Sequence, residues 1–186
     1  MIELNSRRVA LRPFVEHDLP LMYQLCLDEV VSRRFRFGGR TPSAEEVARR
    51  SWENVLCQFV VRDKGRGIES GITTVMAADF VNGTVNAAVL MLPEGRGSAI
   101  GLEAFALTVN YAFRTWPFRK VYSDVLEESF EQFGSGEGKF FEVEGCRKQH
   151  EFAAGRYQDL YTLAIYRDDW LQADDRTRKR LGLTPL

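Results

Sequence analysis

Residues 92–105, LPEGRGSAIGLEAF, change within a few positions from a glycine-rich segment to a helix-forming one. Gly95, Gly97 and Gly101 place three glycines in seven residues, directly after the apolar run TVNAAVLML. A helix that begins here presents unpaired backbone N–H groups and the positive end of its dipole. Glycine lets the backbone approach a bound group closely. This combination is typical of a phosphate or pyrophosphate site.

The spacing of these glycines excludes the two most common nucleotide-binding motifs. No Gly-Lys-Ser/Thr follows, so the segment is not a nucleotide P-loop. The pattern G-x-G-x-x-x-G is one residue off the dinucleotide fingerprint, and it follows a predicted antiparallel hairpin instead of a parallel unit. A plain glycine-containing turn between a strand and a helix is the remaining alternative.

The elements that must position this loop predict an α+β fold. Alternation and β-branched residues predict strands at RRVALRPF, CQFVVRD, IESGITTVMAADF, TVNAAVLML, RKVYSDVL, CRKQHEFA and YQDLYTLAIY. Helical spacing predicts helices over 16–35, from Ser43 onward and over 101–116, while 127–146 reads as helical at both ends.

The order of these elements predicts where the sheet opens. Asn82-Gly83 between apolar runs predicts a type I′ hairpin, so the strand before the loop pairs antiparallel with its predecessor. The same strand and RKVYSDVL are expected to lie parallel, joined by a right-handed crossover. A cleft is expected where they part, with the start of the helix at its mouth.

Composition limits the class of protein. The 186 residues are 45% hydrophobic and 27% charged, which suits a single globular domain over residues 1–186. A net charge of −1 argues against nucleic-acid binding, and no apolar run is long enough for a signal peptide or a membrane span. Cys26, Cys57 and Cys146 fit neither a disulfide framework nor a metal site. We therefore expect a reduced, cytoplasmic protein without a metal.

Several segments together resemble the GNAT family of N-acyltransferases, in particular the Rim-type group of ribosomal-protein alanine N-acetyltransferases. The family loop Gln/Arg-x-x-Gly-x-Gly/Ala is matched by Arg96, Ala99 and Gly101. LRPF…HDL resembles the first strand and helix of the family, and FFEVEGC resembles the segment that usually ends in a Tyr-x-x-x-Gly-Phe pattern. GRYQDLYTLAIYRDDW resembles the closing hairpin and is the most specific piece. The resemblance covers nearly the whole chain. It implies the GNAT fold, a mixed and mostly antiparallel sheet with a parallel splayed pair, flanked by helices.

The resemblance implies acetyl-CoA, or another acyl-CoA, as the co-substrate and a primary amine of a small molecule or peptide as the acceptor. The amine would attack the thioester directly in a ternary complex, with the N–H of Val89 or Leu90 facing the thioester oxygen. A homodimer that pairs its closing hairpins is also implied. The implied cofactor-binding residues are Val89, Leu90, Met91, Arg96, Gly97, Ser98, Ala99, Ile100, Gly101, Ser129 and Phe141.

The residues that handle protons depart from the family pattern. The usual glutamate base aligns with Asn86, which cannot accept the proton of an alkylammonium at neutral pH. The usual tyrosine acid aligns with Phe141, the family asparagine with Ser129, and FGSGEG reads as an insertion. The candidate catalytic residues are therefore Asn86, Tyr122, Glu128, Ser129 and His150, with Asp124 and Glu127 beside them.

Three functions stay open at this point. The first is an acyltransferase with rearranged acid–base groups, in which positioning of a reactive thioester supplies much of the rate. The second is an acyl-CoA-binding protein that no longer transfers. The third is transfer of a non-acetyl or carrier-bound thioester. A cluster of four arginines, Arg33, Arg34, Arg36 and Arg40, predicts either an anionic acceptor or a solvated loop.

Overall fold

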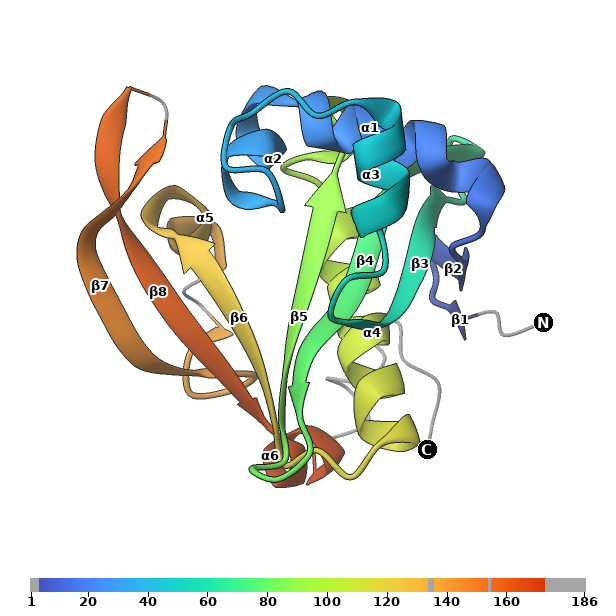
Figure 1. Cartoon of the computed structure of the whole chain (residues 1–186). Helices are drawn as coiled ribbons and strands as arrows, with labels where there is room; N and C mark the ends of the chain where they lie inside the picture. The colour runs from blue at the N-terminus through green and yellow to red at the C-terminus, as the bar shows by residue number, and fades with distance from the viewer. Residues whose placement is uncertain (1–3, 134–135, 154, 173–186) are drawn as a thin grey trace.

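The computed structural model describes residues 4–133, 136–153 and 155–172. Its strands form one mixed, eight-stranded sheet. The strand order is β1-β2-β3-β4-β5-β6-β8-β7 (Figure 1). The strands are β1 Leu4–Asn5, β2 Val9–Pro13, β3 Val55–Asp63, β4 Ile68–Asp79, β5 Thr84–Met91, β6 Lys120–Leu126, β7 Glu142–Ala153 and β8 Arg156–Tyr166. Among these eight strands, β5 and β6 are the one parallel pair, which confirms the predicted mixed sheet.

Helices cover the two faces of the sheet unequally (Figure 1). The helices are α1 Leu19–Leu27, α2 Glu29–Arg34, α3 Ala44–Arg50, α4 Ala99–Thr115, α5 Glu127–Phe133 and α6 Arg167–Gln172. Helix α4 packs on one face, where Val85, Ala87 and Met91 of β5 point into its core. Helices α1 to α3 pack on the opposite face, which Leu90 of β5 contacts. The alternation of side chains along β5 thus divides the protein into two cores.

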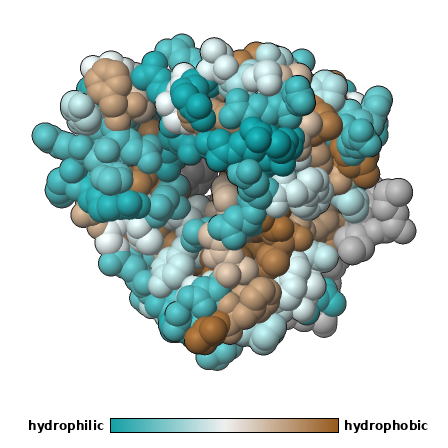
Figure 2. Space-filling model, viewed as in Figure 1, coloured by the Kyte–Doolittle hydropathy of each residue, from teal (hydrophilic) through white to brown (hydrophobic). Residues whose placement is uncertain are grey.

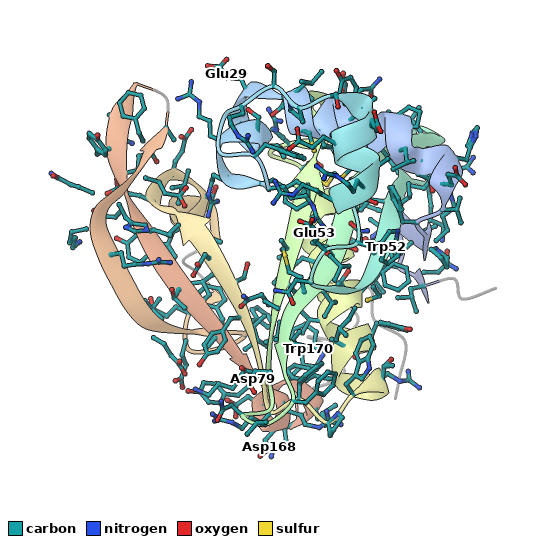
Figure 3. The ribbon with its side chains drawn as sticks, in the orientation of Figure 1. Glu29, Trp52, Glu53, Asp79, Asp168 and Trp170 are labelled. Carbon is teal, nitrogen blue, oxygen red and sulfur yellow. The ribbon has the colours of Figure 1, made fainter. Side chains whose placement is uncertain are left out.

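Helix α6 follows β8 and packs at the end of the sheet where β5 and β6 are paired (Figure 1). Trp170 of α6 lies there (Figure 3) and is 7% exposed. Its Nε1 donates to Oδ1 of Asn110 in α4 at 3.3 Å. A buried tryptophan needs such a partner for its N–H group, so this contact fixes α6 against α4.

Helix α4 begins where the sequence predicts a helix. Ser98 is its N-cap, with Oγ accepting the N–H of Ile100 at 3.3 Å. Trp116 ends the helix, and Pro117 follows. The alanines and Val109 of the buried side pack against β5 and β4, so the position of the glycine-rich loop is set by a 17-residue helix.

Three local predictions are wrong. The helix expected over 16–35 is two helices, because Asp28 adopts an extended ψ of 136° and its side chain caps α2 instead. The second helical end expected within 127–146 is the start of β7 at Glu142. The β4–β5 connection is not a type I′ turn: of its residues only Gly83 has a positive φ, and the Asp79 carboxylate accepts two backbone N–H groups there.

Gly134 and Ser135, within the predicted insertion FGSGEG, lie outside the described residues. No helix in the described ranges is long and apolar enough to cross a membrane.

Candidate active site

The sheet opens between β5 and β6 because these two strands pair over only three residues each. Thr84, Val85 and Asn86 lie opposite Lys120, Val121 and Tyr122. Beyond Asn86 and Tyr122 the strands separate, while each keeps its other neighbour, β4 or β8 (Figure 1). We call this opening the splay. Its two edges carry backbone N–H and C=O groups without a strand partner.

The groups on the β5 edge of the splay follow from the hydrogen-bonding pattern. The N–H of Leu92 donates to the oxygen of Ser70 at 2.9 Å, and the β4–β5 register is unbroken from there to Asn86. Because the direction of these groups alternates along a strand, those of Leu90 face β4 and those of Val89 face the splay. Of the two N–H groups considered for the thioester oxygen, the open one is that of Val89.

The glycines of the loop after β5 serve two different purposes. Gly97 has a φ of 66° and open space around its α-carbon, so it makes the turn before α4. Gly95 and Gly101 instead pack on β5: a Cβ added to Gly95 would lie 2.6 Å from Cε of Met91, and one on Gly101 would lie 3.4 Å from its Cγ. Two of the three glycines therefore let the loop approach the strand, which holds the first turn of α4 beside the splay.

Arg96 ties this loop to α2. Its Nε donates to the oxygen of Met91 at 3.1 Å, and its Nη2 binds Oδ1 of Asp28. The same Asp28 oxygen accepts the N–H groups of Val30 and Val31, each at 3.0 Å, at the start of α2. The arginine of the family loop thus has an internal carboxylate partner in this structure.

A cluster of four polar side chains lies on the α1–α3 face of the sheet, where the splay closes. Tyr122 donates its hydroxyl to Oε2 of Glu144 at 2.8 Å, and Lys120 and Tyr166 also donate to that carboxylate. The ammonium of Lys120 is the main reason why the pKa of Glu144 falls to about 2. Hydrogen bonding to Glu144 in turn raises the pKa of Lys120. Glu144 is therefore an ionised but weak base, committed to three donors.

Asp124 lies nearer the open end of the splay than Tyr122. It follows Tyr122 by two residues on the same face of β6, beyond the last residue that pairs with β5. The carboxylate accepts Oγ1 of Thr162 at 2.6 Å and Nη2 of Arg147 at 2.9 Å. It is 43% exposed, so an acceptor amine can reach it.

The remaining predicted site residues lie at different places around the splay. Asn86 is exposed on β5 where the splay closes, and Glu128 and Ser129 lie in the first turn of α5, which follows β6 directly. His150 of β7 contacts Nη1 of Arg147 at 3.2 Å through its Nε2. Phe141 packs on the opposite, α4 side of the sheet, with its ring centroid 6.4 Å from that of Phe130.

The four arginines that the sequence places between the first two predicted helices all have partners within the protein. Arg33 contacts Glu29 at 3.4 Å and Arg40 contacts Glu46 at 3.9 Å, while Arg36 donates to the backbone oxygens of Arg50 and Ser51. Burial lowers the pKa of Arg36. Arg34 binds Glu151 of β7 at 2.7 Å. The four arginines therefore form a set of separate contacts and not one anion site.

The space-filling view agrees with this geometry. Figure 2 shows the α1–α3 face hollowed between the β7–β8 hairpin and α2, with hydrophilic side chains around the opening. Within the described ranges, no group of three or more histidine, cysteine or acidic side chains is arranged to hold a metal ion.

Comparison with known proteins identifies the family. The model of the acetyltransferase (GNAT) domain matches residues 8–129. Spermidine N(1)-acetyltransferase of Vibrio cholerae is 22% identical over 123 residues, which span 66% of this chain and 70% of that protein.

Solved structures share the fold. The spermidine N-acetyltransferase of Vibrio cholerae in complex with CoA and spermine superposes with a TM-score of 0.74 at 21% identity, covering 89% of this chain and 99% of the other. Its dodecameric form in an intermediate state gives 0.73 at 20% identity, over 90% and 99% of the two chains. The chain belongs to the GNAT acetyltransferase family and is an N-acetyltransferase that uses acetyl-CoA.

Proposed function

We propose that the acceptor is a small aliphatic diamine or polyamine that enters the splay from the α1–α3 face. The observation that carries this proposal is a pair of carboxylates on the far side of the splay, Asp124 and Glu151, whose partners are the guanidinium groups of Arg147 and Arg34. Carboxylates that bind cations in the free protein suit a cationic acceptor. The spermidine acetyltransferases to which the chain is similar act on acceptors of this class.

Acetyl-CoA would lie along the β5 edge of the splay. The first turn of α4 supplies N–H groups for the pyrophosphate, with Arg96, Gly97, Ser98, Ala99, Ile100 and Gly101 around it. The pantetheine arm would follow the open backbone of β5, and the N–H of Val89 would donate to the thioester oxygen as negative charge develops there.

The proton transfers fall to side chains of β6 in this proposal. Asp124 accepts a proton from the acceptor ammonium, directly or through one water, which frees the nitrogen lone pair. The nitrogen attacks the thioester carbon, loses its second proton to a water molecule as the C–S bond breaks, and the CoA thiolate takes a proton from the hydroxyl of Tyr122. Lys120, whose Nζ lies 3.3 Å from that hydroxyl, replaces the proton and regains its own from solvent. Asn86 contributes a hydrogen-bonding amide beside this group and no proton. Glu128, Ser129 and His150 are assigned no transfer step.

An amine panel tests the proposed function. Wild-type protein and acetyl-CoA are incubated with spermidine, spermine, 1,4-diaminobutane and a peptide with N-terminal alanine, and free CoA thiol is measured. Preference for the polyamines supports the proposal. Preference for the peptide would instead support the Rim-type subgroup, which the closing segment GRYQDLYTLAIYRDDW resembles. Asp124→Asn should lower kcat by about 100-fold, because the amide cannot accept the proton of the ammonium group.

The amine panel, combined with calorimetry, separates acetyl transfer from binding of acetyl-CoA alone. Calorimetric titration with acetyl-CoA and with S-acetylpantetheine, which lacks the pyrophosphate, measures what the α4 turn contributes. Binding of acetyl-CoA without release of thiol in the presence of any amine would favour a CoA-binding protein over a transferase.

The chain is also proposed to act as a single catalytic domain over residues 1–186 and to self-associate through its closing hairpin. Phe152 and Tyr157 are 53% and 63% exposed at that hairpin, with ring centroids 5.3 Å apart. Light scattering of wild type and Phe152→Ser measures the oligomeric state, and an unchanged mass would exclude this surface.

A further inference from the structure

Arg34, the last residue of α2, reaches across the mouth of the splay. Its Nε donates to Oε2 of Glu151 at 2.7 Å, and its Nη2 donates to the backbone oxygen of Asp124 at 3.1 Å. Helix α2 covers the upper part of the opening, while both partners belong to strands beyond the splay (Figure 1). The guanidinium group of Arg34 thus crosses the opening and binds two oxygen atoms on its far side, one from Glu151 and one from the backbone of Asp124.

This position suits a cation, and solvent can reach it. The side chains of Arg34 and Glu151 are each 28% exposed, so water and a dissolved cation have access to the ion pair. The backbone of α2 does not depend on the contact. Its C-terminal hydrogen bond runs from the N–H of Phe35 to the oxygen of Val31, so the Arg34 side chain can leave without breaking the helix.

The neighbouring carboxylate is not available to Arg34. Asp124 is occupied by Arg147 and Thr162, at 2.9 and 2.6 Å, so only its backbone oxygen contacts Arg34. Glu151 is therefore the carboxylate whose partner can be exchanged, while Asp124 is held in place by two donors. An acceptor with two ammonium groups can present one at each carboxylate.

We propose that Glu151 binds the second, non-reacting ammonium group of a diamine or polyamine acceptor, and that Arg34 is an internal cation that competes for it and thereby sets acceptor selectivity. The inference rests on the proposed function. Exchange of the guanidinium for an ammonium leaves Glu151 paired, so the carboxylate is never left as an uncompensated charge. A monoamine has no second ammonium group and gains nothing at Glu151.

The test compares two acceptors that differ only in the second amine, 1,4-diaminobutane and 1-aminobutane. The measured quantity is the ratio of their kcat/KM values at saturating acetyl-CoA. Arg34→Met, which keeps the aliphatic stem, should raise the ratio about threefold because the competitor is removed. Glu151→Gln should lower it about tenfold because a charge-assisted contact is lost. Arg33→Met is the matched control, since the guanidinium of Arg33 pairs with Glu29, an exposed residue at the start of the same helix (Figure 3).

The outcomes separate this inference from the proposed function. Opposite shifts of the ratio in Arg34→Met and Glu151→Gln, with the Arg33→Met ratio at the wild-type value, support the inference. An unchanged ratio in both variants, or an equal loss for both amines, overturns it and leaves diamine acetylation standing. Absence of acetylation of any amine by the wild type overturns the proposed function itself. Calorimetric binding of acetyl-CoA by each variant shows that it is folded.

Discussion

Asn86 of β5 and Tyr122 of β6 are opposite each other at the last paired position before the two strands separate. Both side chains lie on the α1–α3 face, and the Tyr122 hydroxyl is fixed by its 2.8 Å bond to Glu144. The floor of the splay thus combines a group that cannot accept a proton with a hydroxyl that can donate one.

This arrangement makes Tyr122 testable as the acid. Tyr122→Phe should lower kcat about 100-fold while leaving KM for the amine and the dissociation constant of acetyl-CoA near their wild-type values, because only the transition state uses the proton. Steady-state kinetics and calorimetry measure these quantities. Tyr166→Phe is the control, since Tyr166 donates to the same carboxylate from β8. Equal losses in the two variants would mean that the hydroxyls only hold Glu144.

Asp28 is expected to restrain Arg96 in the protein without acetyl-CoA. Asp28→Ser keeps a side chain that caps α2 but removes the carboxylate that pairs with Arg96. The freed guanidinium can then pair with the pyrophosphate, so the dissociation constant of acetyl-CoA should fall about threefold at low salt. Calorimetric titration measures it, and Arg96→Met should raise it. A weaker affinity in Asp28→Ser would show that Asp28 orients Arg96 for binding.

Gly71 is required for the approach of β4 to β5. A Cβ at this position would lie 2.2 Å from the backbone oxygen of Leu90, which the strand cannot move without breaking its pairing. Gly71→Ala should lower the free energy of unfolding by about 3 kcal/mol. Gly145→Ala is the matched control in another strand, where an added Cβ has no atom within 4 Å, and should change the stability by less than about 1 kcal/mol. Urea titration compares them, and equal effects would contradict the steric argument.

Local patterns in the sequence predict the elements that hold the splay, but not the contacts across it. Ser98 is a favourable N-cap next to a helical stripe, and the strands of the sheet have recognisable apolar runs, so α4 and the mixed sheet could be predicted. Arg34 and Glu151 are 117 residues apart, and Arg96 and Asp28 are 68 apart, and no local pattern relates them.

Strand register and helix capping explain the other features that the sequence did not predict. Glu144 contacts Tyr122 only because β8 lies between their strands with a particular register, interrupted by an irregularity beside Gly145. The break between α1 and α2 has no proline or glycine to indicate it and depends on one side chain, that of Asp28.

The three cysteines should differ in reactivity. Cys146 is exposed, Cys26 is buried and Cys57 is partly buried. Loss of solvation raises the pKa of Cys26 to about 11 and that of Cys57 to about 12, so both of these thiols stay protonated at pH 8. One thiol per folded chain should react rapidly with iodoacetamide, and three in urea. Mass spectrometry counts the adducts, and Cys146→Ser should remove the rapid one. Rapid labelling of Cys57 in the folded protein would contradict its raised thiol pKa.

Glu144 should make stability depend on pH in the acid range. Its pKa falls from 4.5 to about 2 on folding, mainly because Lys120 donates to it. A carboxyl whose pKa is lower in the folded state contributes stability that is present above pH 4.5 and is lost as the pH falls toward 2, because the unfolded state binds the proton first. Urea unfolding of the wild type and of Glu144→Gln at intervals from pH 6 to pH 2.5 measures this difference. The two free energies of unfolding should converge as the pH falls, since protonated glutamate and glutamine are both neutral, and curves that stay parallel would show that the Lys120–Glu144 contact contributes nothing.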